Sequence, residues 1–96
     1  MVTKIVWTRK AVSDLKDIFD YINKDSSHYA ALTVQQIINK TSLILNFPLA
    51  GRIVPEFSNI GLREFILKNY RIIYRIKGTR AYIVRIYNTY RLLNTI

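Results

Sequence analysis

The sequence predicts an α+β fold with the element order β-α-α-β-β-β. Three observations support this prediction: an alternating, β-branched segment opens the chain, two amphipathic segments with helical spacing follow it, and three strand-like segments separated by short turns come last. Because 96 residues cannot divide their apolar side chains between two cores, we expect residues 1–96 to form a single domain. The expected architecture is an antiparallel sheet of about four strands with a helical hairpin packed on one face.

The first strand is expected at Val2–Thr8, and Thr8 can cap the helix that follows it. Apolar residues recur at helical spacing from Ala11 to Ile22, so this helix should run to about Lys24. A second helix should end near Asn46, before a Phe-Pro pair. Its predicted buried stripe consists of Ala31, Val34, Ile38, Thr41 and Leu45, widened by Ile37 and Ile44.

The second half of the chain reads as a connection followed by a three-stranded meander. Residues 47–60 contain two prolines and a glycine, and a connection of this length is either a lid or a wrap packed against the sheet. Three strands are expected at Leu62–Leu67, Tyr70–Ile76 and Ala81–Tyr87. The turns between them are expected at Lys68-Asn69 and in the segment "KGTR".

A two-residue turn at Lys68-Asn69 places Leu67 opposite Tyr70, which assigns every strand residue to a face. The helix-covered face should carry Phe65, Leu67, Tyr70, Ile72, Tyr74 and Ile76. The opposite face should carry Arg71 and Arg75 beside Ile66, Ile73, Val84 and Ile86. Two helices cover only one side of such a sheet, so we expect this second face to be partly open and to bind a partner. Arg85 falls on the helix-covered side in this register, which indicates a β-bulge.

The charge of the chain is large and unevenly distributed. The net charge is +9, from 15 Lys and Arg residues and 6 Asp and Glu residues. Residues 1–60 hold seven basic and five acidic residues, a net +2, whereas residues 61–96 hold eight and one, a net +7. Such a local excess attracts anions, and either nucleic acid or an acidic protein segment is the usual partner.

Several classes of protein are disfavoured by what the sequence lacks. There is no cysteine, so a disulfide framework and a thiolate site are unavailable and a reducing, cytoplasmic location is expected. No apolar run approaches the length of a membrane span. The sequence has no phosphate loop, no paired His/Glu spacing and no G-x-S-x-G elbow, so we expect no cofactor and no metal.

Four stretches together resemble the toxins of the RelE/ParE superfamily, of the plasmid-stabilisation type. They are "WTRKAVSDLKDIFDYI", "PLAGRIVPEF", "GLREFILKNYRIIYRI" and "RIYNTYRLL", and they extend over essentially the whole chain. The resemblance implies a growth-arresting toxin of a type II toxin-antitoxin system, neutralised by a small acidic antitoxin. One branch of the superfamily cleaves mRNA on the ribosome, whereas the ParE-like branch lacks nuclease residues and poisons DNA gyrase. The opening W-T-x-x-A-x-x-D-L looks more like the ParE type.

If the chain is an endonuclease, it should work without a metal, using a base, an acid and a cation that stabilises the phosphorane. The resemblance makes Arg71 the expected phosphate ligand, with Arg63 and Arg91 beside it, because a guanidinium meets phosphate oxygens in bidentate fashion. Tyr87 or Tyr90 would then donate the proton. Many relatives carry a histidine where this chain has Asn88, and asparagine cannot titrate.

The same surface also suits partner binding, for which Arg71, Arg75, Ile73, Glu64 and Arg91 are the candidates. Glu64 is expected to form an ion pair with Arg71 or Arg75. His28, the sole histidine, should lie at the start of the second helix on the surface. Three hypotheses therefore remain: a gyrase inhibitor, which we favour, a ribosome-dependent mRNA endonuclease, and a degenerate relative that only binds antitoxin. The oligomeric state stays open.

Overall fold

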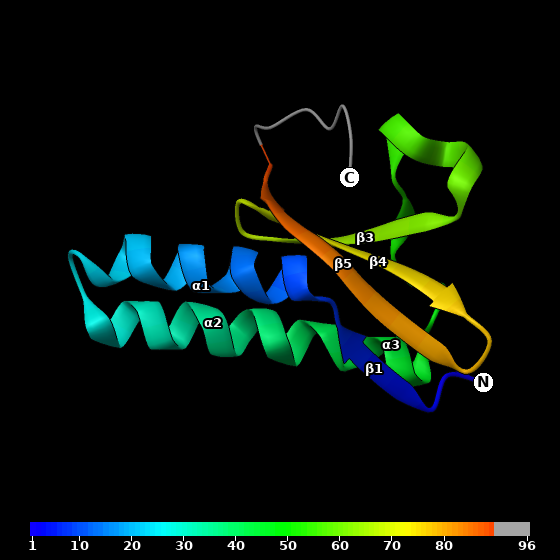
Figure 1. Cartoon of the computed structure of the whole chain (residues 1–96), viewed down its shortest axis with the longest axis horizontal. Coiled ribbons are helices and arrows are strands. Elements are labelled where there is room, and N and C mark those ends of the chain that lie inside the picture. The colour runs from blue at the N-terminus through cyan, green and yellow to red at the C-terminus, as the bar shows by residue number, and fades with distance from the viewer. Residues whose placement is uncertain (90–96) are drawn as a thin grey trace.

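The computed structural model describes residues 1–89, without the side chains of residues 58–60, and it confirms the α+β class. Figure 1 shows the two long helices side by side, with the turn between them projecting beyond the strands of a twisted sheet. The elements in chain order are β1 (Lys4–Trp7), α1 (Arg9–Asn23), α2 (Ser27–Thr41), α3 (Leu43–Asn46), β2 (Arg52–Ile53), the 3₁₀ helix η1 (Pro55–Ile60), β3 (Leu62–Leu67), β4 (Tyr70–Lys77) and β5 (Arg80–Asn88).

The sheet has five strands in the order β1-β5-β4-β3-β2, so the expectation of about four strands was one short. The missed strand, β2, is two residues long and pairs antiparallel with β3. The prediction of a wholly antiparallel sheet was also wrong, because β1 pairs in parallel with β5. Parallel strands cannot be joined by a hairpin turn and need a longer crossover connection. Here the helical hairpin and the strands between β1 and β5 form that connection and bring β5 beside β1 in the same direction.

The capping and turn chemistry agrees with the sequence. The hydroxyl of Thr8 accepts a hydrogen bond from the backbone N–H of Ala11 and so caps α1. Lys68 and Asn69 form the two-residue β3–β4 turn and place Leu67 opposite Tyr70, as predicted. Gly78, at φ 62°, supplies the positive φ that the β4–β5 turn requires.

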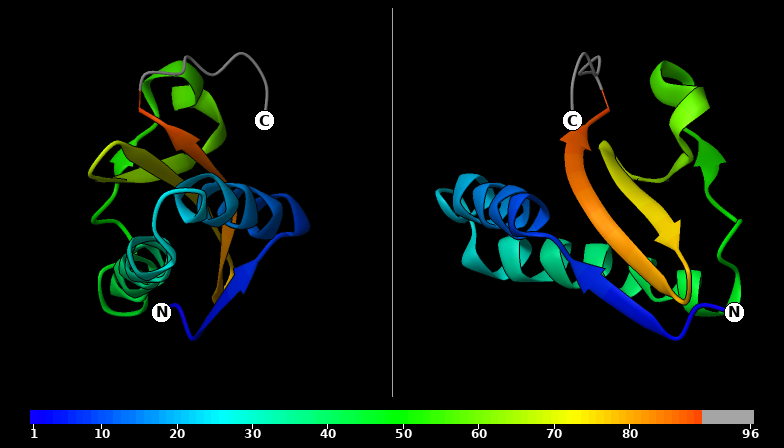
Figure 2. Two further views of the ribbon diagram at one scale, coloured as in Figure 1. Left: turned by 90° about the vertical axis from the view of Figure 1, so that its left-hand side faces the viewer. Right: turned by 45° about the vertical axis from the view of Figure 1, so that its right-hand side comes forward.

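The main core lies between the α1–α2 hairpin and one face of the sheet (Figure 2). The predicted helix-covered face is confirmed, since Phe65, Ile72 and Tyr74 are buried there and Leu67, Tyr70 and Ile76 pack against them. The predicted stripe of α2 was shifted by about one residue. Its buried positions, continued into α3, are Ala30, Thr33, Ile37, Thr41 and Ile44, whereas Ala31, Ile38 and Leu45 are exposed. Ile37, Thr41 and Ile44 are buried as expected, whereas the polar Thr33 was not expected in the stripe, and this concealed its true phase.

The expected β-bulge is present in β5. Tyr74 pairs with Ile83 and Ile73 pairs with Arg85, so Val84 is the extra residue in the register. Downstream of the bulge the faces exchange, and Ile86 enters the helix-side core rather than the opposite face where we expected it. Val84, the bulged residue itself, is on the opposite face as predicted.

Asp14 of α1 holds this irregular segment in place. Its half-buried carboxylate accepts hydrogen bonds from Nε and Nη2 of Arg85, at 2.8 and 3.0 Å, and from the backbone N–H of Ile86 at 2.9 Å. The hydrogen bond to Asp14 is also the largest cause of the raised pKa of Arg85. One carboxylate therefore satisfies both a cation and a backbone donor beside the bulge.

Asp14→Ala is expected to destabilise the fold by about 2 kcal/mol, because it leaves the Ile86 N–H and the Arg85 guanidinium without their partner. The matched control is Asp20→Ala in the same helix, which removes only the exposed pair with Lys16 and should cost less than about 0.5 kcal/mol. Urea unfolding at constant m-value measures both variants. Equal shifts of the two midpoints would contradict this role for Asp14.

Candidate functional site

The predicted cationic face is largely covered at one end by the chain's own residues 52–60, which we call the strap. Beside the strap, Ile66 stays exposed, as expected, and a hollow of about 350 Å³ is lined by Arg52, Pro55, Glu56, Ile66, Arg71 and Thr89. Val54 and Phe57 of the strap pack on Leu62, Ile73 and Tyr87 and form a second, smaller core. The backbone N–H of Val54 donates to the carbonyl of Leu62 at 3.1 Å. Of the two interpretations of residues 47–60, the packed wrap is the one found, and Figures 1 and 2 show η1 and the helical hairpin on different sides of the strands.

The strap makes the expected exposure of Ile73 wrong, because the side chain of Ile73 is fully buried beneath it. The expectation for Arg71 was wrong for the same reason, since this residue is only 5% exposed. The sequence placed both side chains on the correct face of the sheet. It did not reveal that the connection after α3 would fold back over them.

Arg71 lies at the centre of a buried network of charges. Its Nε donates to Oε1 of Glu64 at 2.7 Å, and its two terminal nitrogens donate to the two carboxylate oxygens of Glu56, both at 2.8 Å. The second contact is the bidentate, charge-assisted arrangement in which arginine binds carboxylates and phosphates most strongly. The hydrogen bond to Glu56 is the largest cause of the raised pKa of Arg71, which stays charged.

Glu64 is fully enclosed, and its second oxygen accepts a hydrogen bond from Nε of Arg52. Its partners are therefore Arg71, as predicted, and Arg52 rather than Arg75. Arg52 reaches Glu64 because β2 pairs with β3 in the register Arg52↔Glu64. Removing one member of such a buried network leaves an uncompensated charge, at a cost of about 3–5 kcal/mol.

Arg63 lies on the other face of the sheet from Arg71. It pairs in register with Tyr74 of the helix-side core, and its Nη1 donates to the carbonyl oxygens of Gly51 and Leu49 at 2.9 and 3.3 Å. Tyr74 fixes the same turn, accepting from the N–H of Gly51 at 3.0 Å and donating to the carbonyl of Pro48 at 2.9 Å. The structure therefore does not bring Arg63 and Arg71 together, and Arg63 anchors the entrance to the strap.

Tyr87 is opposite Arg71 in the β4–β5 register and is buried in the second core, with the guanidinium of Arg85 4.6 Å above its ring. Asn88 is exposed at the end of β5. Tyr90 and Arg91 fall outside the described residues. His28 is exposed on α2, as expected, and lies in the helical layer rather than on the face that holds Arg71.

Sequence reasoning missed two members of the network, Arg52 and Glu56. Only two carboxylates follow the helices, Glu56 and Glu64, in a region crowded with arginine. A strand arginine that becomes buried needs carboxylate partners, so these two residues could have been assigned to Arg71 once a strap was postulated. Arg52 gave no comparable signal, because β2 is too short to show strand periodicity.

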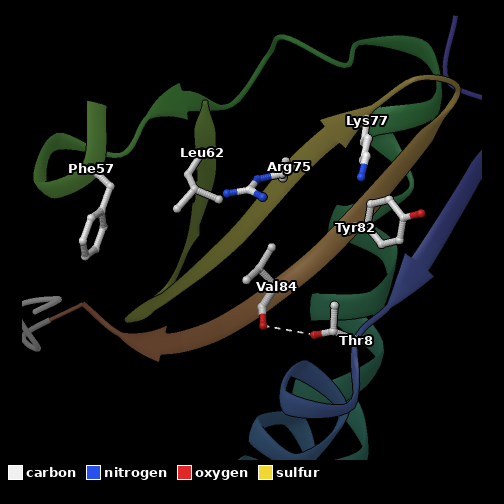
Figure 3. Close-up of a pocket in the computed structure, with 7 residues that line it drawn as sticks. All are labelled: Thr8, Phe57, Leu62, Arg75, Lys77, Tyr82 and Val84. Carbon is white, nitrogen blue, oxygen red and sulfur yellow. Dashed lines mark hydrogen bonds between the residues drawn. The ribbon is translucent and has the colours of Figure 1, made fainter. Parts of the chain in front are cut away.

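The other end of the face stays open as a hollow of about 640 Å³, which we call the far-face groove (Figure 3). Phe57, Leu62 and Val84 supply apolar walls, and Arg75 and Lys77 project from β4 beside them. Tyr82 and Thr8 complete the lining, which contains two cations and no carboxylate. Of the residues that we expected on the open face, Arg75 and Val84 line this groove.

Within residues 1–89, no helix is both long enough and apolar enough to cross a membrane.

Comparison with known proteins agrees with this architecture. Residues 5–92 match the family model described as the ParE toxin of the type II toxin-antitoxin system parDE. Among solved structures, a chain of the chromosomal ParDE toxin-antitoxin system from P. aeruginosa is similar to this one, with a TM-score of 0.76 and 29% sequence identity over 92% of this chain and 96% of that chain. A search of curated proteins finds no match.

Proposed function

The chain belongs to the family of ParE toxins of type II toxin-antitoxin systems, and from this premise we propose that it arrests growth by inhibiting DNA gyrase in the cytoplasm. It is the toxin component of such a system, and a cognate antitoxin is its partner. The identity of its target is the part that we propose, and the state of Arg71 is the observation that supports it.

Arg71 was the expected phosphate ligand of an endonuclease, and its guanidinium is already occupied by two carboxylates. A phosphorane would have to displace Glu56 from the terminal nitrogens and would then approach a centre that holds two negative side chains. Stabilising a dianionic transition state needs donors aimed at an open position. The geometry around Arg71 supports a structural role for this residue and disfavours phosphoryl transfer.

The general acid and base are the second difficulty for the endonuclease hypothesis. Metal-free RNA cleavage needs groups that exchange protons near neutral pH, and imidazole is the usual one. In contact with Arg71 or opposite it in the sheet register, residues 1–89 offer the ion-paired Glu56 and Glu64 and the buried Tyr87. Each of these is already committed to packing or to an ion pair. Growth arrest by binding a target fits this chemistry better than growth arrest by cleavage.

We propose further that the antitoxin occupies the far-face groove with a segment that is both acidic and apolar. Arg75 and Lys77 are exposed beside a concave apolar surface, and the groove lining supplies no carboxylate to neutralise them. A partner that presents apolar side chains to Phe57, Leu62 and Val84 and carboxylates to the two cations would complement this surface in both shape and charge.

The target is tested with purified toxin, released from its antitoxin, in two parallel assays. We expect loss of plasmid supercoiling by purified gyrase, together with intact message in a ribosome-supplemented translation extract. Toxin mixed with its antitoxin before each assay is the control. Codon-dependent cuts in the message with supercoiling unaffected would establish the endonuclease instead, and inactivity in both assays would establish a degenerate relative.

The groove is tested by reversing its two cations. Arg75→Glu combined with Lys77→Glu should weaken antitoxin binding at least about tenfold, since like charges then face each other across the interface. Lys10→Glu combined with Lys24→Glu makes the same change in net charge on exposed residues at the two ends of α1, in the helical layer, and should have little effect. Calorimetric titration with antitoxin measures both. Equal losses of affinity in the two variants would show that net charge, not the groove, is responsible.

A further inference from the structure

A second cationic surface surrounds the β3–β4 turn, where this turn meets the helical hairpin. Hollows of about 390 and 200 Å³ lie on either side of Lys68 and extend to residues of α2. We call this region the turn surface and define it by six of the lining residues, Lys40, Lys68, Gln36, Asn39, Tyr29 and Tyr70. Tyr70 and Lys77 are the two ends of β4, so the turn surface and the far-face groove are about 20 Å apart along that strand.

The two lysines of the turn surface are held over aromatic rings. Lys68 Nζ lies 5.2 Å from the ring centroid of Tyr29, and Lys40 Nζ lies 5.5 Å from that of Phe65. Each contact restricts a side chain that would otherwise sample many rotamers, and it leaves the positive charge at the surface. The entropic cost of ordering a lysine against a bound anion is reduced accordingly.

The positive charge of the turn surface is not balanced locally. Neither hollow is lined by a carboxylate. Four of the six acidic residues of the chain are engaged elsewhere, two with Arg71 and one each with Arg85 and Lys16. The positive charges of Lys40 and Lys68 therefore remain available to attract an external anion.

The neutral polar groups of the turn surface are hydrogen-bond donors of the kind that proteins use on phosphates. Asn39 and Asn69 stand beside the two lysines in the lining of the hollows. The side-chain oxygen of Gln36 is buried and is the one such side-chain atom without a hydrogen-bond partner among the described residues.

We propose that the turn surface binds the phosphodiester backbone of a nucleic acid. Lysine ammonium groups and side-chain amides form the contacts that bind a nucleic-acid backbone without reading its sequence. The location is compatible with an antitoxin in the groove, because the two surfaces lie at opposite ends of β4 and on different faces of the sheet. The inference rests on the proposed function only for the source of the phosphates, which is duplex DNA if gyrase is the target and RNA if the ribosome is.

The test compares two double variants of equal net charge. The first combines Lys40→Gln with Lys68→Gln, and the control combines Lys4→Gln with Lys10→Gln. Fluorescence anisotropy with a labelled DNA duplex and with a labelled single-stranded RNA measures affinity over a series of salt concentrations. The first variant should bind its nucleic acid at least about tenfold more weakly. The slope of log K against log salt should fall by about 1.8 on the duplex or about 1.4 on the single strand, since each lost phosphate contact removes about 0.9 or about 0.7 respectively. The control should keep the slope of the unmodified toxin.

Each arm of this experiment has a defined meaning. A loss confined to the duplex identifies DNA, and a loss confined to the RNA identifies RNA. Equal losses in both variants, or no loss in either, would overturn the proposal. So would an unchanged nucleic-acid affinity with weakened antitoxin binding, because the turn surface would then be a protein interface. Gyrase inhibition is measured on the same variants, so that the proposed function can stand while this inference fails.

Discussion

The placement of Arg71 between Glu56 and Glu64 is the interaction on which the functional face depends. A guanidinium that is 5% exposed must be neutralised, and the two carboxylates that do so come from the strap and from β3. The bidentate contact with Glu56 ties the strap to the sheet, and this brings Val54 and Phe57 onto Ile73 and Tyr87. Without this connection, the apolar residues beneath the strap would be exposed to water.

The strap divides one face of the sheet into two parts with different roles. Its closed part contains Arg71 and Tyr87, two of the residues that a nuclease of this superfamily was expected to use, and it commits them to ion pairs and to packing. Its open part keeps two exposed cations beside an apolar hollow, which suits an acidic and apolar partner. Among the basic residues of 61–96, Arg71 belongs to the buried network, Arg75 and Lys77 belong to the groove, and Lys68 belongs to the turn surface.

Much of the fold could be predicted from local patterns. The cap at Thr8, the turn at Lys68-Asn69 and the alternation along β3 and β4 each follow from neighbouring residues, and together they assigned the helix-side core correctly. The parallel pairing of β1 with β5 could not be read in this way, since it joins residues about 75 positions apart and has no turn to specify it. The bulge was indicated by Arg85, whose charge conflicted with a core position.

The candidate site was harder to predict than the fold. Arg71, Ile73 and Glu64 were placed on the correct face, because strand alternation determines the face. Their burial depended on where a proline-containing connection of fourteen residues would lie, and that depended on tertiary ion pairs with Glu56 and Arg52. Such contacts leave no periodic signal in a sequence. A resemblance to a family supplied the toxin assignment, but it could not show that the chain covers its own arginine.

The most direct test of this account is amide hydrogen exchange at Val54, whose N–H donates to Leu62 across the strap. The account predicts that this amide is protected in the unmodified protein and that Glu56→Gln raises its exchange rate about tenfold, because a charge-assisted pair is replaced by a neutral one worth about 1.4 kcal/mol less. Asp20→Asn, in an exposed ion pair, should leave the rate unchanged. Rapid exchange at Val54 in the unmodified protein, or a rate indifferent to Glu56→Gln, would contradict the claim that the Arg71 network holds the strap.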